Sequence, residues 1–297
     1  MSDYDDSEIE ASRAPLLDHL IELRKRLIIC VAAIILGFAI CFTFSQQIYT
    51  VLLHPFKMAA QMYAATGKGH GGAGPFDLLF VLIGLKAAPA ATGTLELMFT
   101  APLEFFFTKL KLAGFGAVIL TFPVLAWQVY AFVAPGLYKR ERHAFLPFLV
   151  AAPVLFSMGA ALVYYIILPF VLWFSLSQQI MTEGIAVQLL PKVSDYLTLV
   201  TTLLLAFGLC FQLPVVLTLL GLAGIVNSAM LWKGWRYAVF AVVVVAAIVT
   251  PPDPISQLLL ATPIILLYFI SIGCVKLIEM RRKKEDEAAG TDVASLP

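Results

Sequence analysis

The chain has 297 residues, of which 61% are hydrophobic and 13% charged, and its mean hydropathy is +0.91. A globular domain carries about 25% charged residues, so this composition excludes a soluble globular protein and indicates an integral membrane protein. The net charge of +1 gives no indication of a nucleic-acid partner. The four cysteines lie in apolar runs without a CxxC pair, which indicates small buried side chains rather than metal ligands or disulfides.

Residues 1–14 form an acidic, polar segment that we expect to be a disordered tail, and no apolar core stands directly behind it as in a cleaved signal peptide. From Pro15, leucines recur at helical spacing beside charged residues. This pattern predicts an interfacial amphipathic helix that leads into a first crossing over residues 27–45. Pro55 ends the apolar stretch that follows this crossing.

An external loop is expected over residues 55–108. Its glycine-rich insert, within residues 66–92, lacks the Gly-Lys-Ser/Thr of a P-loop and predicts a flexible loop rather than a phosphate site. Two long charge-free runs then predict a second crossing at 109–132, kinked at Pro123, and a third at 145–168, ended by Pro169.

The second external loop is expected at 170–195, with a surface helix near its start. The fourth crossing follows at 196–222 and contains Gln212. Residues 237–250 form a fifth apolar run of 14 residues, which is roughly 21 Å as a helix and too short for a bilayer core of about 30 Å.

A hairpin containing Asp253 leads to the sixth crossing, which completes a membrane domain over residues 15–276; residues 277–297 are expected to be a disordered tail. The sequence therefore predicts an all-α membrane protein with six transmembrane helices, the last two short. With this topology 14 of the 20 basic residues fall on one face, which places both termini in the cytoplasm.

Few side chains in the apolar runs can carry chemistry. None of the four histidines lies within a crossing, which argues against a haem bundle, and no nucleophile–base set indicates an enzyme. No nucleotide or metal-binding motif is present, so no cofactor is expected. A transporter for small molecules or ions, using Asp253 and broken helices, remains an alternative, although the absence of an internal repeat weakens it.

Two acidic residues stand where apolar runs meet basic loops: Glu22 before the first crossing and Glu141 between the second and third. One interpretation is local pairing, Glu22 with Arg26 and Glu141 with its basic neighbours. The other is a shared groove in which both carboxylates bind a cationic ligand, because carboxylates bind guanidinium groups through charge-assisted, bidentate hydrogen bonds.

Four ordered motifs resemble the TatC family, the six-helix receptor of the twin-arginine protein translocase: HLIELRKRL at 19–27, FVAPGLYKRER at 132–142, FGLCFQLP at 207–214 and TPPDPISQ at 250–257. The resemblance covers about residues 15–276. It implies a concave bundle in the bacterial cytoplasmic (inner) membrane, and it favours the shared groove over local pairing. It also implies a signal-peptide site for the Arg-Arg pair of folded precursors, formed by Glu22, Arg24, Glu141, Phe132, Leu137, Tyr138 and Arg142.

The resemblance further implies a polar cluster that docks the single helices of TatA and TatB, and structural motif positions. The cluster is Gln212, Thr250 and Gln257, and the structural positions are Pro55, Pro123, Pro135 and Asp253. Other copies of the chain are expected in the complex, with transport driven by the proton motive force. Relatives often carry Glu where this chain has Gln212, and an amide cannot titrate, so only a hydrogen-bonding role is expected there.

Overall fold

The computed structural model describes residues 3–66, 98–99, 101–133, 146–178, 180–182, 185–187, 192–249 and 254–293. The elements within them are α1 (Asp3–Thr43), α2 (Ser45–Leu52), α3 (His54–Thr66), α5 (Glu104–Val133), α6 (Leu146–Leu162), the π-helical turn η3 (Val163–Ile167), α7 (Leu168–Ser177), β1 (Ile180–Thr182), β2 (Ile185–Val187), α8 (Val193–Cys210), α9 (Leu213–Leu222), α10 (Ser228–Val249) and α11 (Pro254–Val293). The two strands form a small antiparallel hairpin with Met181 opposite Ala186.

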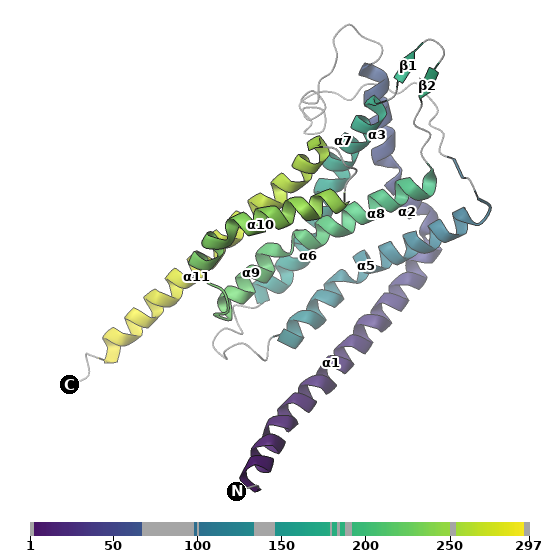
Figure 1. Cartoon of the computed structure of the whole chain (residues 1–297). Coiled ribbons are helices and arrows are strands. Elements are labelled where there is room, and N and C mark those ends of the chain that lie inside the picture. Colours follow the sequence, from purple (N-terminus) through teal and green to yellow (C-terminus); the bar gives the residue numbers. More distant parts are fainter. Residues whose placement is uncertain are drawn as a thin grey trace.

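Six helical stretches of the described chain are long and apolar enough to cross a membrane: Leu20–Thr43, Glu104–Phe132, Phe148–Ser177, Val193–Leu222, Ser228–Val249 and Gln257–Lys283. Figure 1 shows them as an elongated bundle with both chain termini at one end and the β1–β2 hairpin at the other. We call these the terminal end and the hairpin end. The predicted all-α membrane class with six spans is confirmed.

At the hairpin end, α3, which lies outside the six spans, packs against the last part of the third span. There α3 lies against α7, and Trp173 of α7 is buried in the same cluster as Phe56 of α3. Two tyrosines cap the last turn of α2: the Tyr196 hydroxyl donates to the Leu52 carbonyl at 2.5 Å, and the Tyr164 hydroxyl donates to the Val51 carbonyl at 2.7 Å. These bonds satisfy carbonyls that a helix end leaves without intrahelical partners.

The third span differs from its prediction, because Pro169 does not end it. The helix runs from α6 through the π-turn η3 into α7, which continues to Ser177. A proline removes one backbone donor and crowds the carbonyl four residues earlier, here that of Tyr165. The π-turn at Val163–Ile167 places the irregular backbone directly before the proline, so the chain stays helical.

The fifth helix also differs, because α10 begins at Ser228 and is 22 residues long, about 33 Å at 1.5 Å per residue. The helix is therefore longer than the apolar run of residues 237–250 on which the short crossing was predicted, although it remains the shortest of the six described spans. Gly224, with φ at 72°, ends α9: Ile225 N–H donates to the Leu220 carbonyl at 3.0 Å, the pattern of a Schellman motif. Asn227 then caps α10, since its Oδ1 accepts the Met230 N–H at 2.7 Å.

Both tails are helical where they were expected to be disordered. α1 begins at Asp3, within the segment 1–14, and α11 continues past residue 276 to Val293. Acidic residues in the first turn of α1, Asp3, Asp5 and Asp6, favour its extension because they interact with the positive end of the helix dipole, whereas the last turn of α11 has no basic residue. Pro55 lies in the first turn of α3, and Pro123 lies inside α5.

Candidate functional site

The helices α1 and α5 pack closely along their length. A side-chain carbon added at Gly37 would lie 2.8 Å from Thr121 Cγ2, and one added at Gly116 would lie 2.9 Å from Cys41 Sγ. Small residues at such contacts let two helix backbones approach, which is a common means of helix association in a membrane. These contacts fix the half of α1 nearer the hairpin end relative to α5.

A groove of about 440 Å³ lies between α1 and α5 near the terminal end. We call it the α1–α5 groove and define it by its lining residues: Ile21, Glu22, Lys25, Arg26, Ile29 and Gln128. Five of the six lie on α1 at spacings of one, three and four residues, which places them on one helix face. Apolar side chains therefore flank a charged centre.

Among the described lining residues Glu22 is the only acid, and its side chain is 34% exposed. Arg26 Nε donates to Glu22 Oε1 at 3.1 Å, and Arg26 Nη2 donates to the same oxygen. The local Glu22–Arg26 pair expected from the sequence is therefore present. Among the described residues, none donates a hydrogen bond to the second carboxylate oxygen, Glu22 Oε2.

The structure does not bring every predicted residue to this groove. Arg24 is exposed and does not line it, because two residues along a helix turn a side chain by roughly 200° from Glu22. Phe132 lies one turn beyond Gln128 on α5 and is partly buried. Four further predicted positions of this site lie outside the described residues: Leu137, Tyr138, Glu141 and Arg142. The predicted structural position Pro135 also lies outside them.

Gln128 is the lining residue to which the sequence assigned no role. It is one of the few amides within a charge-free run, and that rarity was the available signal. That Gln128 and Glu22 line the same groove could not be predicted, because it depends on how α1 crosses α5, and the sequence of neither helix alone specifies this crossing. Lys25 was equally unassigned, although it follows Glu22 by three residues on the same face.

The predicted partner-docking amides each have a backbone partner. Gln212, at the break between α8 and α9, donates to the Ala152 carbonyl of α6 at 2.8 Å. Gln257 of α11 donates to the Val243 carbonyl of α10 at 3.2 Å. Thr250 and Asp253 lie outside the described residues.

The two amides lie at different depths. A side chain on Gly221 would meet Val275, so these residues of α9 and α11 are level with each other. Both helices run toward the terminal end, and Gln257 precedes Val275 by 18 residues whereas Gln212 precedes Gly221 by nine. Gln257 therefore lies about 14 Å farther toward the hairpin end.

The fold and this groove define a multi-pass helical membrane protein with a charged, peptide-sized recess at the end that carries both termini. Within the described residues, no group of three histidine, cysteine or acidic side chains could hold a metal ion.

Comparison with known proteins gives the family. The family model described as Sec-independent protein translocase protein (TatC) matches residues 18–263. The Sec-independent protein translocase protein TatC of Magnetococcus marinus is 42% identical over 277 residues, covering 93% of this chain and 89% of that protein. The corresponding protein of Desulforapulum autotrophicum is 31% identical, covering 94% and 91%.

A crystal structure described as the twin arginine translocase receptor TatC superposes with a TM-score of 0.66 at 31% identity, covering 87% of this chain and 98% of that one. The chain belongs to the TatC family of Sec-independent protein translocases. It is thus a translocase subunit and not an enzyme.

Proposed function

We propose that this chain is the subunit that recognises the Arg-Arg signal peptides of folded precursors, and that the α1–α5 groove is part of the recognition site. The observation that carries the proposal is the half-desolvated carboxylate of Glu22, which keeps one oxygen open in the groove. A guanidinium group forms charge-assisted hydrogen bonds with such an oxygen, and these are stronger at a partly desolvated surface than in water.

The charge of the groove argues for a second acid. The described lining holds one carboxylate, Glu22, and two cations, Lys25 and Arg26, so its formal charge is −1 + 2 = +1. A lining of this charge does not attract two further guanidinium groups. Our proposal therefore includes Glu141, which follows α5 in sequence, as the second carboxylate that meets the Arg-Arg pair.

The apolar part of the groove supports the same function. Ile21 and Ile29 flank the charged centre by about one turn on either side of Lys25. A peptide with two arginines followed by an apolar segment would place its cations at Glu22 and its apolar side chains along these residues. We extend the proposed site to Phe132, one turn beyond Gln128 on α5, and to Leu137, Tyr138 and Arg142, which follow Phe132 in sequence.

The orientation is part of the proposal. The terminal end carries most of the basic residues, which favours the cytoplasmic face of a bacterial inner membrane for both termini. Signal peptides of folded precursors approach from that face. Gln212, Thr250 and Gln257 are proposed to receive the single helices of TatA and TatB, because an amide within hydrocarbon favours a polar partner. Transport would then use the proton motive force.

Crosslinking tests the recognition site. A synthetic or precursor-borne Arg-Arg signal with a photoreactive residue is captured by membranes that contain the full chain, with the variants Glu22→Gln, Glu141→Gln and both together. Because a hydrogen bond to a charged group contributes about 1.5–3 kcal/mol, each single variant should bind roughly 10- to 150-fold more weakly. Asp195→Asn, an exposed acid at the hairpin end, is the matched control and should capture normally.

Capture by the double variant at the level of the control would reject the carboxylate site. A signal with Lys-Lys in place of Arg-Arg adds a chemical check. Lysine cannot reproduce the planar, bidentate geometry of guanidinium, so the Lys-Lys signal should bind the unmodified chain less well than the Arg-Arg signal. This difference between the two signals should be smaller in the double variant.

A further inference from the structure

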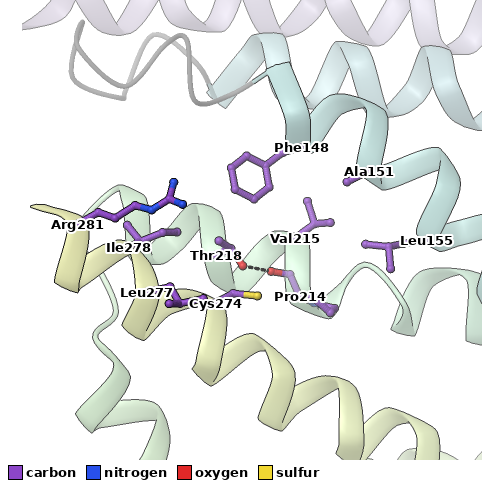
Figure 2. Close-up of a pocket in the computed structure, with 10 residues that line it drawn as sticks. All are labelled: Phe148, Ala151, Leu155, Pro214, Val215, Thr218, Cys274, Leu277, Ile278 and Arg281. Atoms are coloured by element: carbon purple, nitrogen blue, oxygen red, sulfur yellow. Dashed lines mark hydrogen bonds between the residues drawn. The ribbon is translucent and has the colours of Figure 1, made fainter.

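A second cavity, separate from the α1–α5 groove, lies between α6, α9 and α11 at the terminal end. Its volume is about 340 Å³, and we call it the α6–α9–α11 cavity. Figure 2 shows its ten lining residues: Phe148, Ala151, Leu155, Pro214, Val215, Thr218, Cys274, Leu277, Ile278 and Arg281. Eight have uncharged, largely apolar side chains without a hydroxyl, and Arg281 is the only charged member.

The cavity has one polar and one apolar end. In Figure 2 the Arg281 guanidinium lies beside Phe148 at one side of the drawn set, and Leu155 lies at the other. Leu155 follows Phe148 by seven residues on α6, which is roughly 10 Å along the helix. The space therefore extends from the terminal end of the bundle about two turns into the apolar span.

Arg281 is available to a ligand. It is exposed, and no described residue forms a hydrogen bond or ion pair with it. Its neighbours differ: the Arg282 guanidinium donates to the Leu222 carbonyl at 2.7 Å, and Glu279 is held by Ser228. No acid is among the described residues that line the cavity, so none of them neutralises the cation at its mouth.

The mainly apolar lining of the cavity favours one class of ligand over another. A peptide would bring backbone N–H and C=O groups that need partners, and leaving them unpaired in an apolar space is unfavourable. The lining offers one hydroxyl, Thr218, which already donates to the Pro214 carbonyl. An acyl chain needs no such partners, and an anionic headgroup matches the guanidinium at the mouth.

We propose that the α6–α9–α11 cavity is a binding site for an anionic phospholipid, with one acyl chain along Phe148, Val215 and Leu277 and the phosphate at Arg281. Arg281 lies at the level where a headgroup meets hydrocarbon, since the candidate span of α11 ends at Lys283. The site ties α6 to α9 and α11 through a lipid rather than through side chains alone. It does not depend on the proposed signal-peptide site.

The native thiol of Cys274 in the lining provides the assay. The full chain in neutral detergent is titrated with phosphatidylglycerol or with zwitterionic phosphatidylcholine of the same acyl chains. Alkylation of each cysteine by N-ethylmaleimide is followed by peptide mass spectrometry. Cys30 on α1, which is also partly exposed, reports shielding by lipid that is not specific to the cavity.

Phosphatidylglycerol should protect Cys274 at about fivefold lower concentration than phosphatidylcholine, which corresponds to about 1 kcal/mol for one arginine at a membrane surface. Arg281→Gln should remove this preference. Lys283→Gln, which removes the same charge two residues away on another face of α11, should retain it. Cys30 should show no preference in any variant.

Equal protection of Cys274 by the two lipids, or a preference that survives Arg281→Gln, would overturn the proposal. So would stronger protection by a synthetic Arg-Arg signal peptide in phosphatidylcholine than by phosphatidylglycerol, because the cavity would then be a peptide site. Glu22 and Glu141 stay intact throughout, so a negative result here leaves the recognition proposal standing.

Discussion

Two glycine–phenylalanine contacts hold α6 against α8, and they give a sharp test of the packing. A side-chain carbon at Gly208 of α8 would lie 2.5 Å, 2.7 Å and 2.8 Å from three ring carbons of Phe156 on α6. One at Gly159 of α6 would lie 2.7 Å from the Phe211 ring and 2.9 Å from the Phe207 carbonyl oxygen. Each glycine thus receives an aromatic ring from the opposite helix.

The Phe156 ring cannot swing away from Gly208. It is only 2% exposed, and the Phe122 ring of α5 stacks on it with 4.0 Å between ring centroids. Gly208→Ala should therefore destabilise the fold. Overpacking typically costs about 1–3 kcal/mol, and the gain in helix propensity offsets about 0.5–1 kcal/mol of this.

The control is Gly114→Ala on α5, where an added carbon would meet nothing within 4 Å. The same substitution should leave stability unchanged or raise it slightly, because only the propensity gain remains. The two variants should differ by about 2 kcal/mol, or roughly 4–6 °C in apparent Tm. Thermal unfolding of the purified chain in detergent, followed by circular dichroism, measures this difference at one scan rate.

A compensating substitution separates ring contact from backbone contact. Phe156→Leu should restore much of the stability in a Gly208→Ala background, because the three atoms nearest to the added carbon all belong to that ring. Phe211→Leu should restore less in a Gly159→Ala background, since the Phe207 carbonyl remains in place. Equal melting of Gly208→Ala and Gly114→Ala would refute the described approach of α6 to α8.

Two hydrogen-bonding predictions follow. The backbone N–H of Ser228, at the start of α10, donates to Glu279 Oε1 at 2.7 Å. Glu279→Gln removes a favourable negative charge from this helix N-terminus, so it should destabilise the fold by about 1 kcal/mol in the same thermal assay. Tyr196→Phe should destabilise the fold by about 1–3 kcal/mol, because it removes the hydroxyl that donates to the Leu52 carbonyl. The control Tyr237→Phe, at a residue that is 82% exposed, should leave the stability unchanged. Equal apparent Tm for the two tyrosine variants would contradict the described capping of α2.

The six apolar spans could be predicted because five of them contain a charge-poor run close to the length of a bilayer core and the fifth in chain order contains a shorter one. Their ends were less predictable. Pro169 was predicted to end the third crossing, yet the helix continues through it, and α10 begins before the predicted run 237–250 and includes Lys233 and Arg236. A π-turn accommodates the proline, and long basic side chains can extend to the interface while their backbone remains helical.

The boundary of α10 was nevertheless encoded locally. Gly224 and Asn227 are a C-terminal glycine and an N-terminal asparagine cap within three residues of each other, which is a recognisable helix–turn–helix signal. The pairing of Glu22 with Arg26 was equally local and could be predicted. The position of Gln128 in the α1–α5 groove, and of Cys274 in the same cavity as Phe148, depends on helix crossings that no single segment specifies.

The Glu22–Arg26 pair does not conflict with the proposed recognition of an arginine pair. A carboxylate left alone at a half-desolvated surface would be unfavourable, and Arg26 satisfies it through Oε1 while the groove is empty. A peptide guanidinium can use Oε2 without displacing Arg26, so binding adds one charge-assisted bond and buries no unpaired group. Because the lining already holds two cations, such a bond is weak alone and depends on a second carboxylate, which makes recognition selective for two adjacent arginines and still reversible.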